Sequence, residues 1–225
     1  MKPQEFFPID ERQLRQLRAL VAKGEGHHLE FKRKAAFPEK IIREMIAFAN
    51  SKGGILLLGI GDDGTIPGLK HPEGESHVIR EALRRCSPAL PLKETFIPIG
   101  KNRSVIQYEI AESRRKPHYF IVSDQVKESF VRVEDKSIRA SKEVREIAKR
   151  SQHARDIRFH YGEYERMLMQ HLDQHHTITL KEFTELSGLK RLIASKKLIL
   201  LVLADVLQIT PHEKGDIFSL APEAG

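Results

Sequence analysis

The spacing of apolar residues over residues 28–64 predicts a strand, a helix and a second strand. Residues 28–32 alternate apolar Leu29 and Phe31 with polar neighbours, which is the two-residue period of a half-buried strand. Pro38 suits the first turn of a helix. Apolar residues then recur at helical spacing and form one stripe, which consists of Ile41, Ile42, Met45, Ile46 and Ala49. The apolar run at 55–60 is typical of a strand covered on both faces.

Glycine-containing turns separate these predicted elements. The Gly-Gly pair at 53–54 follows the helical stripe, where glycine accepts the left-handed conformation of a helix C-terminus. The Asp-Asp-Gly sequence at 62–64 predicts a tight turn after the second strand. Upstream, Asp10 with Gln13 three positions later has the pattern of a capping box, and it opens a predicted helix that ends at Gly24.

The rest of the first 150 residues mixes helical and strand patterns. The predicted elements are a helix over 76–85, strands over 92–99 and 105–110 joined by a turn at 100–103, short strands at 120–122 and 129–133, and a helix over 141–150. Because strands, hairpins and helices alternate, we predict an α+β domain over residues 1–150, with a mixed sheet and flanking helices.

Beyond residue 150 the pattern changes, and the polar, basic segment 148–159 contains the predicted domain boundary. Helices are predicted over 164–172, from the capping-box pair Thr179 and Glu182 to Gly188, and over 190–206. Strands at 207–209 and 217–220 form a closing hairpin. Three helices followed by a hairpin predict a small winged helix-turn-helix domain over residues 151–225.

Composition and charge narrow the class of protein. With 31% charged and 40% hydrophobic residues, the 225-residue chain is predicted to be globular, with one or two cores. Its net charge of +7 favours a polyanionic partner, nucleic acid first and an anionic membrane second. The single cysteine, Cys86, excludes an internal disulfide and a cysteine-rich zinc site. A polar N-terminus and a longest apolar run of only residues 198–203 lead us to expect a cytoplasmic protein without a membrane span.

Several short motifs together resemble the Schlafen AlbA_2 family, once described as a divergent AAA domain. They are Glu25, the Glu-Phe-Lys at 30–32, the Ala-Phe-Ala-Asn at 47–50 with its Gly-Gly pair, the Leu-Gly-Ile at 58–60 and the turn at 62–64; looser matches are 115–119, 130–133 and Ser137. The resemblance covers about residues 15–145. Schlafens pair two such lobes in one chain, so a chain with one lobe is expected to form a homodimer.

Three carboxylates raise the question of catalysis. Glu25 and Glu30 flank the start of the first strand and Asp62 ends the next, so the three side chains can converge. Oxygen ligands suit magnesium or manganese, which can polarise a phosphodiester and activate a water. The resemblance assigns these residues to the acidic catalytic trio of schlafen RNases, although Gly61 stands where the family usually carries another acid and no schlafen zinc site is present. Alternatively, Glu30 pairs with Lys32 or an arginine, and Asp62 is a turn residue.

Two groups of basic residues are candidate nucleic-acid contacts. In the first domain they are Lys32, Arg114, Arg115, Lys116, His118, Tyr119 and Arg132, where an aromatic ring beside arginines can stack on an unpaired base. In the second domain they are Lys190, Arg191, Lys196 and Lys197 on the predicted recognition helix and Lys214 in the wing. The alternative for both groups is an ordinary solvated surface.

Two other motifs have weaker functional support. The glycines at 59–64 fit G-x-G-x-x-G, but no helix is predicted directly after them and two aspartates would repel phosphate, so we expect no nucleotide site. His171, His175 and His176 have metal-ligand spacing but stand at a helix end, where histidine is also favoured by the helix dipole. Cys86 has no evident histidine partner, which indicates a structural thiol.

These observations predict a nucleic-acid-binding protein, and a DNA-binding transcriptional regulator in particular. Two alternatives remain open. One is a divalent-metal RNase of schlafen type acting on tRNA or other RNA, with magnesium or manganese as its cofactor. The other is a scaffold without catalytic activity, whose winged helix only dimerises.

Overall fold

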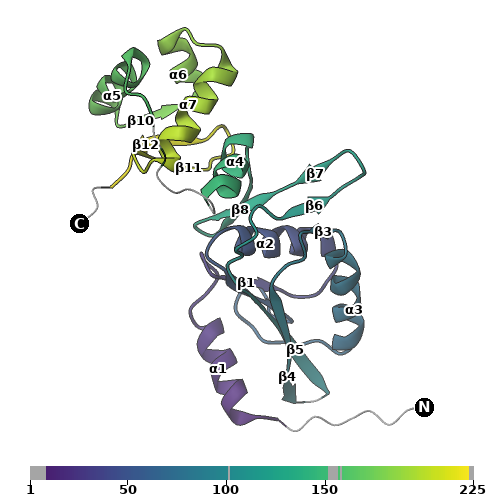
Figure 1. Cartoon of the computed structure of the whole chain (residues 1–225). Coiled ribbons are helices and arrows are strands. Elements are labelled where there is room, and N and C mark those ends of the chain that lie inside the picture. The colour runs from purple at the N-terminus through teal and green to yellow at the C-terminus, as the bar shows by residue number, and fades with distance from the viewer. Residues whose placement is uncertain (1–8, 101, 152–156, 158, 223–225) are drawn as a thin grey trace. The chain divides into compact units, whose positions relative to one another are not determined.

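The computed structural model describes residues 9–100, 102–151, 157 and 159–222, and the chain divides into two compact units (Figure 1). The first unit comprises the chain up to Ser113 together with His118–Ser137, and the second comprises Arg114–Pro117 and the chain from Ile138 onward. None of the described helices is both long enough and apolar enough to cross a lipid bilayer.

A mixed four-stranded sheet forms the centre of the first unit. Its order is β1 (Leu29–Lys32), β2 (Gly54–Leu58), β5 (Arg103–Ile110) and β4 (Leu92–Gly100). β1 and β2 are parallel, whereas β2–β5 and β5–β4 are antiparallel. The parallel pair needs a crossover, which α2 (Pro38–Asn50) supplies. The predicted α+β fold with a mixed sheet is confirmed for this unit.

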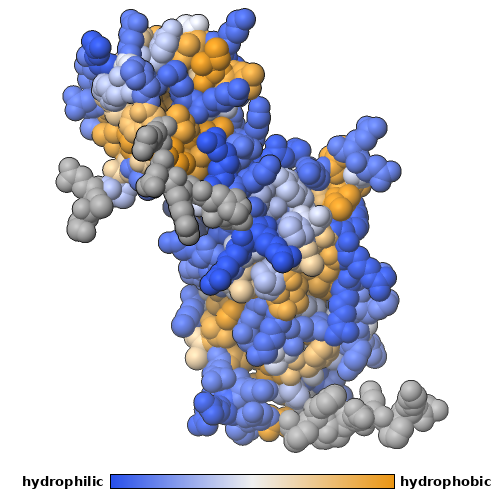
Figure 2. All heavy atoms as spheres, viewed as in Figure 1, coloured by the Kyte–Doolittle hydropathy of each residue, from blue (hydrophilic) through white to orange (hydrophobic). Residues whose placement is uncertain are grey.

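Helices cover both faces of this sheet. This explains why the sequence of β2 is apolar throughout. Leu56 and Leu58 lie in a core that includes residues of α2 and Ile79 of α3 (Pro72–Leu83). Leu57, between them, lies in a second core with Leu14, Leu17 and Val21 of α1 (Glu11–Val21). Successive strand residues point to opposite faces, so a strand between two cores must be apolar at every position. On the face shown in Figure 2, hydrophilic side chains surround the remaining apolar patches.

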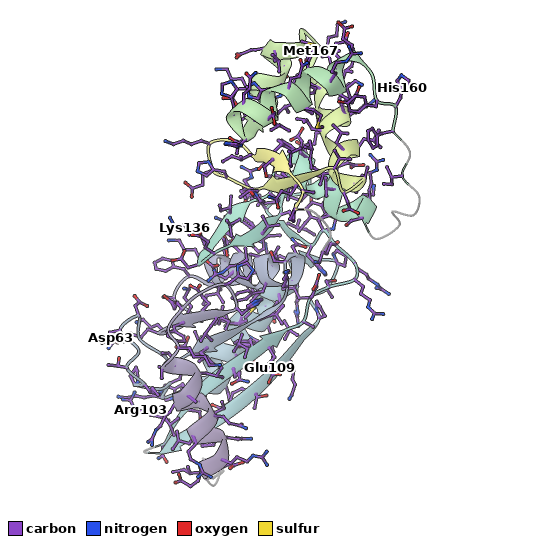
Figure 3. All side chains as sticks on the ribbon, turned by 90° about the vertical axis from the view of Figure 1, so that its left-hand side faces the viewer. Asp63, Arg103, Glu109, Lys136, His160 and Met167 are labelled. Atoms are coloured by element: carbon purple, nitrogen blue, oxygen red, sulfur yellow. The ribbon has the colours of Figure 1, made fainter. Side chains whose placement is uncertain are left out.

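The glycine-rich segment after β2 is a turn, as predicted. The N–H of Gly61 donates to the carbonyl of Thr65 at 2.9 Å, and Arg103 at the start of β5 donates to the carbonyls of Pro67 and Gly68 at 3.1 Å each. Asp63 and Arg103 are labelled in Figure 3. The next helix, α3, begins only at Pro72, so no helix N-terminus follows the glycines directly.

The end of α2 anchors the later part of the first unit. The side-chain amide of Asn50 donates to the carbonyls of His118 and Phe130, and its oxygen accepts from the N–H of His118 at 2.7 Å. These bonds hold a second, three-stranded sheet of β3 (Cys86–Ser87), β6 (Tyr119–Ile121) and β7 (Lys127–Glu128), and the strand β8 (Phe130–Val133) that follows it, near α2. Polar bonds to a buried backbone satisfy groups that would otherwise be unpaired.

The second unit consists of helices and a three-stranded antiparallel sheet. After β9 (Lys136–Arg139), in which the first unit ends, come α4 (Lys142–Arg150), α5 (Glu163–His175), β10 (Thr177–Thr179), α6 (Leu180–Ser187), α7 (Arg191–Leu203), β11 (Leu207–Thr210) and β12 (Ile217–Leu220). The sheet order is β10–β12–β11. The sequence analysis predicted β11 and β12 but not β10, because a three-residue strand is too short to show a period.

Local signals set the helix ends of the second unit correctly. The Thr179 hydroxyl accepts from the N–H of Glu182, whose carboxylate accepts from the N–H of Thr179 at 2.7 Å. Gly188 ends α6 in the left-handed conformation, with φ +66°. The capping box and the glycine stop predicted for this helix are confirmed.

Helix α4 belongs with the second unit by its contacts. The buried Glu143 accepts from the hydroxyl of Ser195 on α7 at 2.6 Å, and Ser141 hydrogen-bonds to Asp216. The sequence analysis grouped this helix with the first domain, since amphipathic spacing does not say which core a helix joins. The predicted division into two domains at residues 150 and 151 remains a prediction.

The Gly-Gly pair after α2 leads to a first stability prediction. Gly53 has φ +75°, and a Cβ there would lie 2.7 Å from the carbonyl oxygen of Ile110. Gly53→Ala is therefore expected to lower the free energy of unfolding by about 2–4 kcal/mol. In α3, a Cβ on Gly74 meets nothing within 4 Å. Gly74→Ala should raise stability by up to about 1 kcal/mol. Urea titration of both variants measures this; equal stability of the two would contradict the assigned backbone.

Candidate functional site

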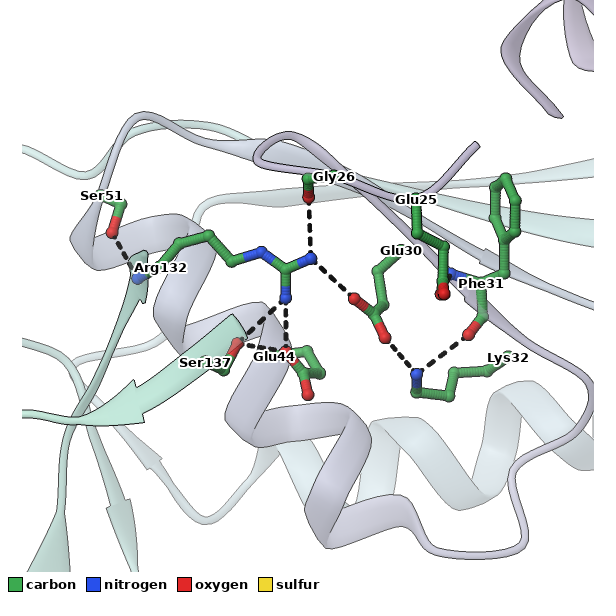
Figure 4. A network of polar contacts seen from close by, with 9 residues as sticks. All are labelled: Glu25, Gly26, Glu30, Phe31, Lys32, Glu44, Ser51, Arg132 and Ser137. Atoms are coloured by element: carbon green, nitrogen blue, oxygen red, sulfur yellow. Dashed lines mark hydrogen bonds and ion pairs between the residues drawn. The ribbon is translucent and has the colours of Figure 1, made fainter. Parts of the chain in front are cut away.

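Of the predicted acidic residues, Glu30 binds a buried arginine, Arg132 of β8, and Glu25 lies nearby (Figure 4). Its side chain is 1% exposed. One terminal nitrogen donates to Glu30 and to the carbonyl of Gly26, both at 2.8 Å, and the other donates to Glu44 at 2.9 Å. The Phe48 ring centroid lies 4.9 Å from the guanidinium carbon. The arginine charge is thus shared between two carboxylates, of which Glu30 is 10% and Glu44 is 22% exposed.

Three elements far apart in the sequence supply these groups. Glu30 comes from β1, Glu44 from α2 and Arg132 from β8, and the backbone N–H of Arg132 also donates to the hydroxyl of Ser51 at 2.8 Å. Ser137 hydrogen-bonds to Glu44. The contacts therefore fasten the first strand, the crossover helix and a strand about 100 residues later to one another.

Of the three predicted carboxylates, Glu25 lies close enough to Glu30 and to Asp62 for their charges to act on it. The Glu25 carboxylate accepts from the N–H of Phe31 at 2.7 Å. Burial is the main cause that raises the pKa of Glu25, and repulsion from Glu30 and from Asp62 adds to it, against the lowering effect of the Phe31 N–H and of Lys32. Like charges that perturb one another lie at short range.

The arrangement does not fit a divalent metal ion. One Glu30 oxygen faces Lys32 and the other faces Arg132, so both oxygens that would ligate a cation already meet cationic donors. In the described part of the chain, no group of three or more His, Cys, Asp or Glu side chains is placed to hold a metal. A magnesium or manganese ion would have to displace Lys32 and Arg132. The pairing that the sequence left as the alternative is the one observed, and we derive no catalytic step through a metal.

Sequence reasoning missed Glu44. Burial raises the pKa of its carboxyl and repulsion from Glu30 adds to this, while the Ser137 hydroxyl and the charge of Arg132 oppose it. A signal was present: Glu44 stands three positions after Ile41 and four before Phe48, on the apolar face of α2. A carboxylate on such a face needs a buried cation as its partner.

Two predicted nucleic-acid contacts are corrected by their burial. Arg132 has no exposed guanidinium, for the reasons above. His118 is buried with its ring nitrogens 2.9 Å from the carbonyl of Pro88 and 2.6 Å from the hydroxyl of Ser113. Neither side chain reaches the surface where a phosphate or base would lie. The sequence alone does not distinguish a basic residue that is buried with a hydrogen-bond partner from one that is exposed to solvent.

The other predicted contacts of the first group are more accessible. Arg114 and Arg115 are exposed and Lys116 is half-buried. Lys32 is half-buried and pairs with Glu30. Tyr119 is half-buried, and the ammonium of Lys127 lies 4.5 Å from its ring centroid.

In the second unit, most cations at the start of α7 are exposed, and one lysine of this helix is held in an ion pair. Lys190, Arg191 and Lys196 are exposed, as is Lys214 in the turn between β11 and β12. Lys197 instead pairs with the buried Glu165. Burial alone would raise the pKa of Glu165, but the bonds from Lys197 and from the N–H of Gly162 outweigh it and hold the pKa below its usual range.

Neither the histidine cluster nor the cysteine adds a reactive site. His171 and His175 stack with ring centroids 4.5 Å apart, and they belong to no metal-binding group among the described residues. Burial raises the pKa of the Cys86 thiol to about 12, so it is protonated at neutral pH and a poor nucleophile.

The family model described as Schlafen, AlbA_2 matches residues 25–141, which is more than half of the chain. The chain therefore belongs to the Schlafen AlbA_2 family. The matched segment contains Glu25, Glu30, Glu44 and Arg132, and so includes the whole buried network. Residues 142–225, which contain most of the second unit, lie outside the match.

No curated protein matches this chain, and the solved structures similar to it include two of low similarity. The N-terminal domain of a RecG-related protein from Nitrosomonas europaea is 23% identical, with a TM-score of 0.38 over 52% of this chain and 86% of that one. The DIP2311 protein from Corynebacterium diphtheriae is 19% identical, with a TM-score of 0.41 over 63% of this chain and 32% of that one. Similarity at this level supports no functional assignment.

Removing the buried cation tests the network. Arg132→Met leaves two largely buried carboxylates without their partner, so we expect the free energy of unfolding to fall by about 3–5 kcal/mol at pH 7.5. The deficit should shrink toward pH 5. The Arg132 charge, which opposes the raised pKa of Glu44, is missing in the variant, so the folded variant protonates Glu44 more readily than the unfolded chain does. Arg84→Met, at an exposed pair with Glu81, should change stability by less than about 0.5 kcal/mol. Urea titrations at both pH values measure this, and a pH-independent deficit would contradict it.

Proposed function

We propose that this protein binds nucleic acid, and that it acts as a transcriptional regulator which contacts duplex DNA through its second unit. Membership of the Schlafen AlbA_2 family and the net charge of +7 support a nucleic-acid partner. The order and pairing of elements in the second unit support the more specific function.

The second unit has the element order of a winged helix-turn-helix. The order is a helix, a short strand, two helices joined at Gly188, and two antiparallel strands joined by an exposed turn; the first strand pairs with the last. In proteins of this class the second helix of the pair enters the major groove, and the wing approaches the adjacent backbone. Here those elements are α7 and the turn between β11 and β12.

The observation that carries the proposal is the group of exposed cations at the start of α7, whose remaining turns pack into the core. Ala194, Leu198 and Leu201 are buried in the core of the second unit. Lys190, Arg191 and Lys196 are exposed and have no ion-pair partner among the described residues. Exposed cations at the start of a recognition helix fix its register on the duplex through phosphate contacts.

A second candidate function, a dimerising scaffold, is favoured by a different observation on the same helix pair. Leu186, Leu192 and Ile193 are 39%, 54% and 45% exposed, and they lie at the end of α6 and the start of α7. Single exposed apolar residues are normal, but three around one turn are typical of a protein contact. The RNase alternative has no comparable support, because the acidic trio does not fit a metal.

Charge reversal on α7 tests duplex binding. Lys190→Glu combined with Lys196→Glu should weaken binding of the full chain to duplex DNA by 10-fold or more, and should lower the salt dependence of binding by about two ions. Fluorescence anisotropy with a labelled random-sequence duplex at low salt measures both. Lys197 is left unchanged, because its ion pair with Glu165 is structural.

The control for this experiment is Lys93→Glu combined with Lys181→Glu, which changes the net charge equally at two exposed lysines outside α7. It should bind like the wild type apart from a small loss from the altered net charge. Equal losses for the two double variants would rule out α7 as the contact.

The dimer is tested by adding charge to the apolar cluster. If the second unit dimerises there, Leu192→Glu combined with Ile193→Glu should convert a dimer to a monomer in analytical ultracentrifugation, because the charges would be buried in the interface. The matched control is Val78→Glu on α3 in the first unit, also an exposed apolar position. A wild-type mass of one chain would contradict the dimer.

A further inference from the structure

Phe37 is the most exposed large hydrophobic side chain in the part of the chain that the structure describes, at 67%. It stands in the first unit between β1 and α2, directly before Pro38. The ammonium of Lys40 lies 5.1 Å from its ring centroid. An aromatic ring of this size is normally buried, so its exposure calls for an explanation.

The surrounding chain holds Phe37 outward on a fixed backbone. Two residues earlier, Ala35 is buried in the core and its N–H donates to the Glu75 carboxylate at 2.6 Å. One residue later, Pro38 begins α2. The backbone that carries the ring is therefore fixed on both sides, so little backbone entropy is lost when a ligand covers the ring.

Cations around Phe37 exceed the acids available to them. Arg33 and Lys34 are exposed in the same loop, and Lys40 follows in the first turn of α2. Of the nearby acids, Glu39 pairs with Arg85, and Glu75 already accepts from Ala35.

A further acid near this loop is Asp63, on which the charge of Arg33 acts. Its pKa is lowered mainly by the hydroxyl and the N–H of Thr65, and only weakly by Arg33. Lys34 and Lys40 have no acidic partner among the described residues, so the positive charge around the ring is largely uncompensated.

Arg85 joins this loop to the β6–β7 hairpin. Besides its ion pair with Glu39, it donates to the carbonyls of Ile121 and Val122 at 3.0 and 3.3 Å. The first turn of α2 therefore lies beside the hairpin, as the ribbon in Figure 1 also shows. The hairpin adds exposed apolar residues, one cation and one acid to the surface, which are Ile121, Val122, Val126, Lys127 and Asp124.

We propose that this surface, made of Arg33, Lys34, Phe37, Lys40 and the hairpin at residues 119–128, binds single-stranded nucleic acid. An unpaired base stacks on the free face of Phe37, and the flanking phosphates contact the cations. A duplex hides its base faces and offers nothing to an exposed ring, whereas single strands are bound by aromatic platforms within a positive surface. The uncompensated cations favour this ligand over an apolar protein segment. The site is distinct from α7 and does not depend on duplex binding there.

Substitution of Phe37 in the full chain tests the proposal. With a labelled single strand of about 12 nucleotides, Phe37→Ala should weaken binding by about 10-fold or more, while Phe37→Trp should bind at least as tightly as the wild type. Val78→Ala, at another exposed apolar position of the same unit, is the control and should be unchanged. Because Phe37 is exposed, all three variants should unfold at the wild-type temperature.

Measuring each variant with both the single strand and the duplex distinguishes binding at this surface from binding at the second unit. Phe37→Ala should lose the single strand and keep the duplex, and Lys190→Glu with Lys196→Glu should do the reverse. Lys34→Glu with Lys40→Glu should weaken the single strand and reduce its salt dependence. The proposal is overturned if the wild type binds no single strand at low salt, if Phe37→Ala binds it normally, or if Phe37→Ala changes only self-association, which would indicate a protein contact.

Discussion

A buried guanidinium cannot remain without partners, and Arg132 meets this constraint by drawing together the parts of the first unit that are far apart in sequence. Its two terminal nitrogens take a carboxylate from β1 and another from α2, and a backbone carbonyl completes the set. The mixed sheet and its crossover helix are thereby connected to β8, which lies at the end of the unit. The desolvation of three charges is offset only while all three are in place.

The same constraint decides what the acidic residues do. Glu30 is a reasonable metal ligand when read as a carboxylate beside two others, and its neighbours Glu25 and Asp62 do lie close enough to affect one another. Its two oxygens nevertheless face Lys32 and Arg132. Glu30 and Glu44 are thus paired within the first unit with Lys32 and Arg132.

Two of the surfaces that carry exposed positive charge differ in character. On α7, exposed lysines and an arginine lie at the start of the helix, whose remaining turns pack into the core, which suits the regular phosphates of a duplex. Around Phe37, cations border an exposed ring and an apolar hairpin, which suits the unstacked bases of a single strand. The two proposals therefore assign a different form of nucleic acid to each of these surfaces.

The sequence by itself determined the elements with strong periodicity and the residues with strong local signals. The stripe of α2, the apolar strand β2 and the capping box at Thr179 could be predicted because each depends on neighbours within a few positions. The sequence also indicated that carboxylates would meet at the ends of adjacent strands.

Only the tertiary structure decided which charges are paired. Arg132 and His118 became buried, Glu44 joined the network from 88 residues away, and Lys197 became the partner of Glu165. Helix α4 packed with α7 for the same reason, because amphipathic spacing does not identify the partner core. Pairing and burial depend on contacts between distant segments, and no local pattern of residues contains that information.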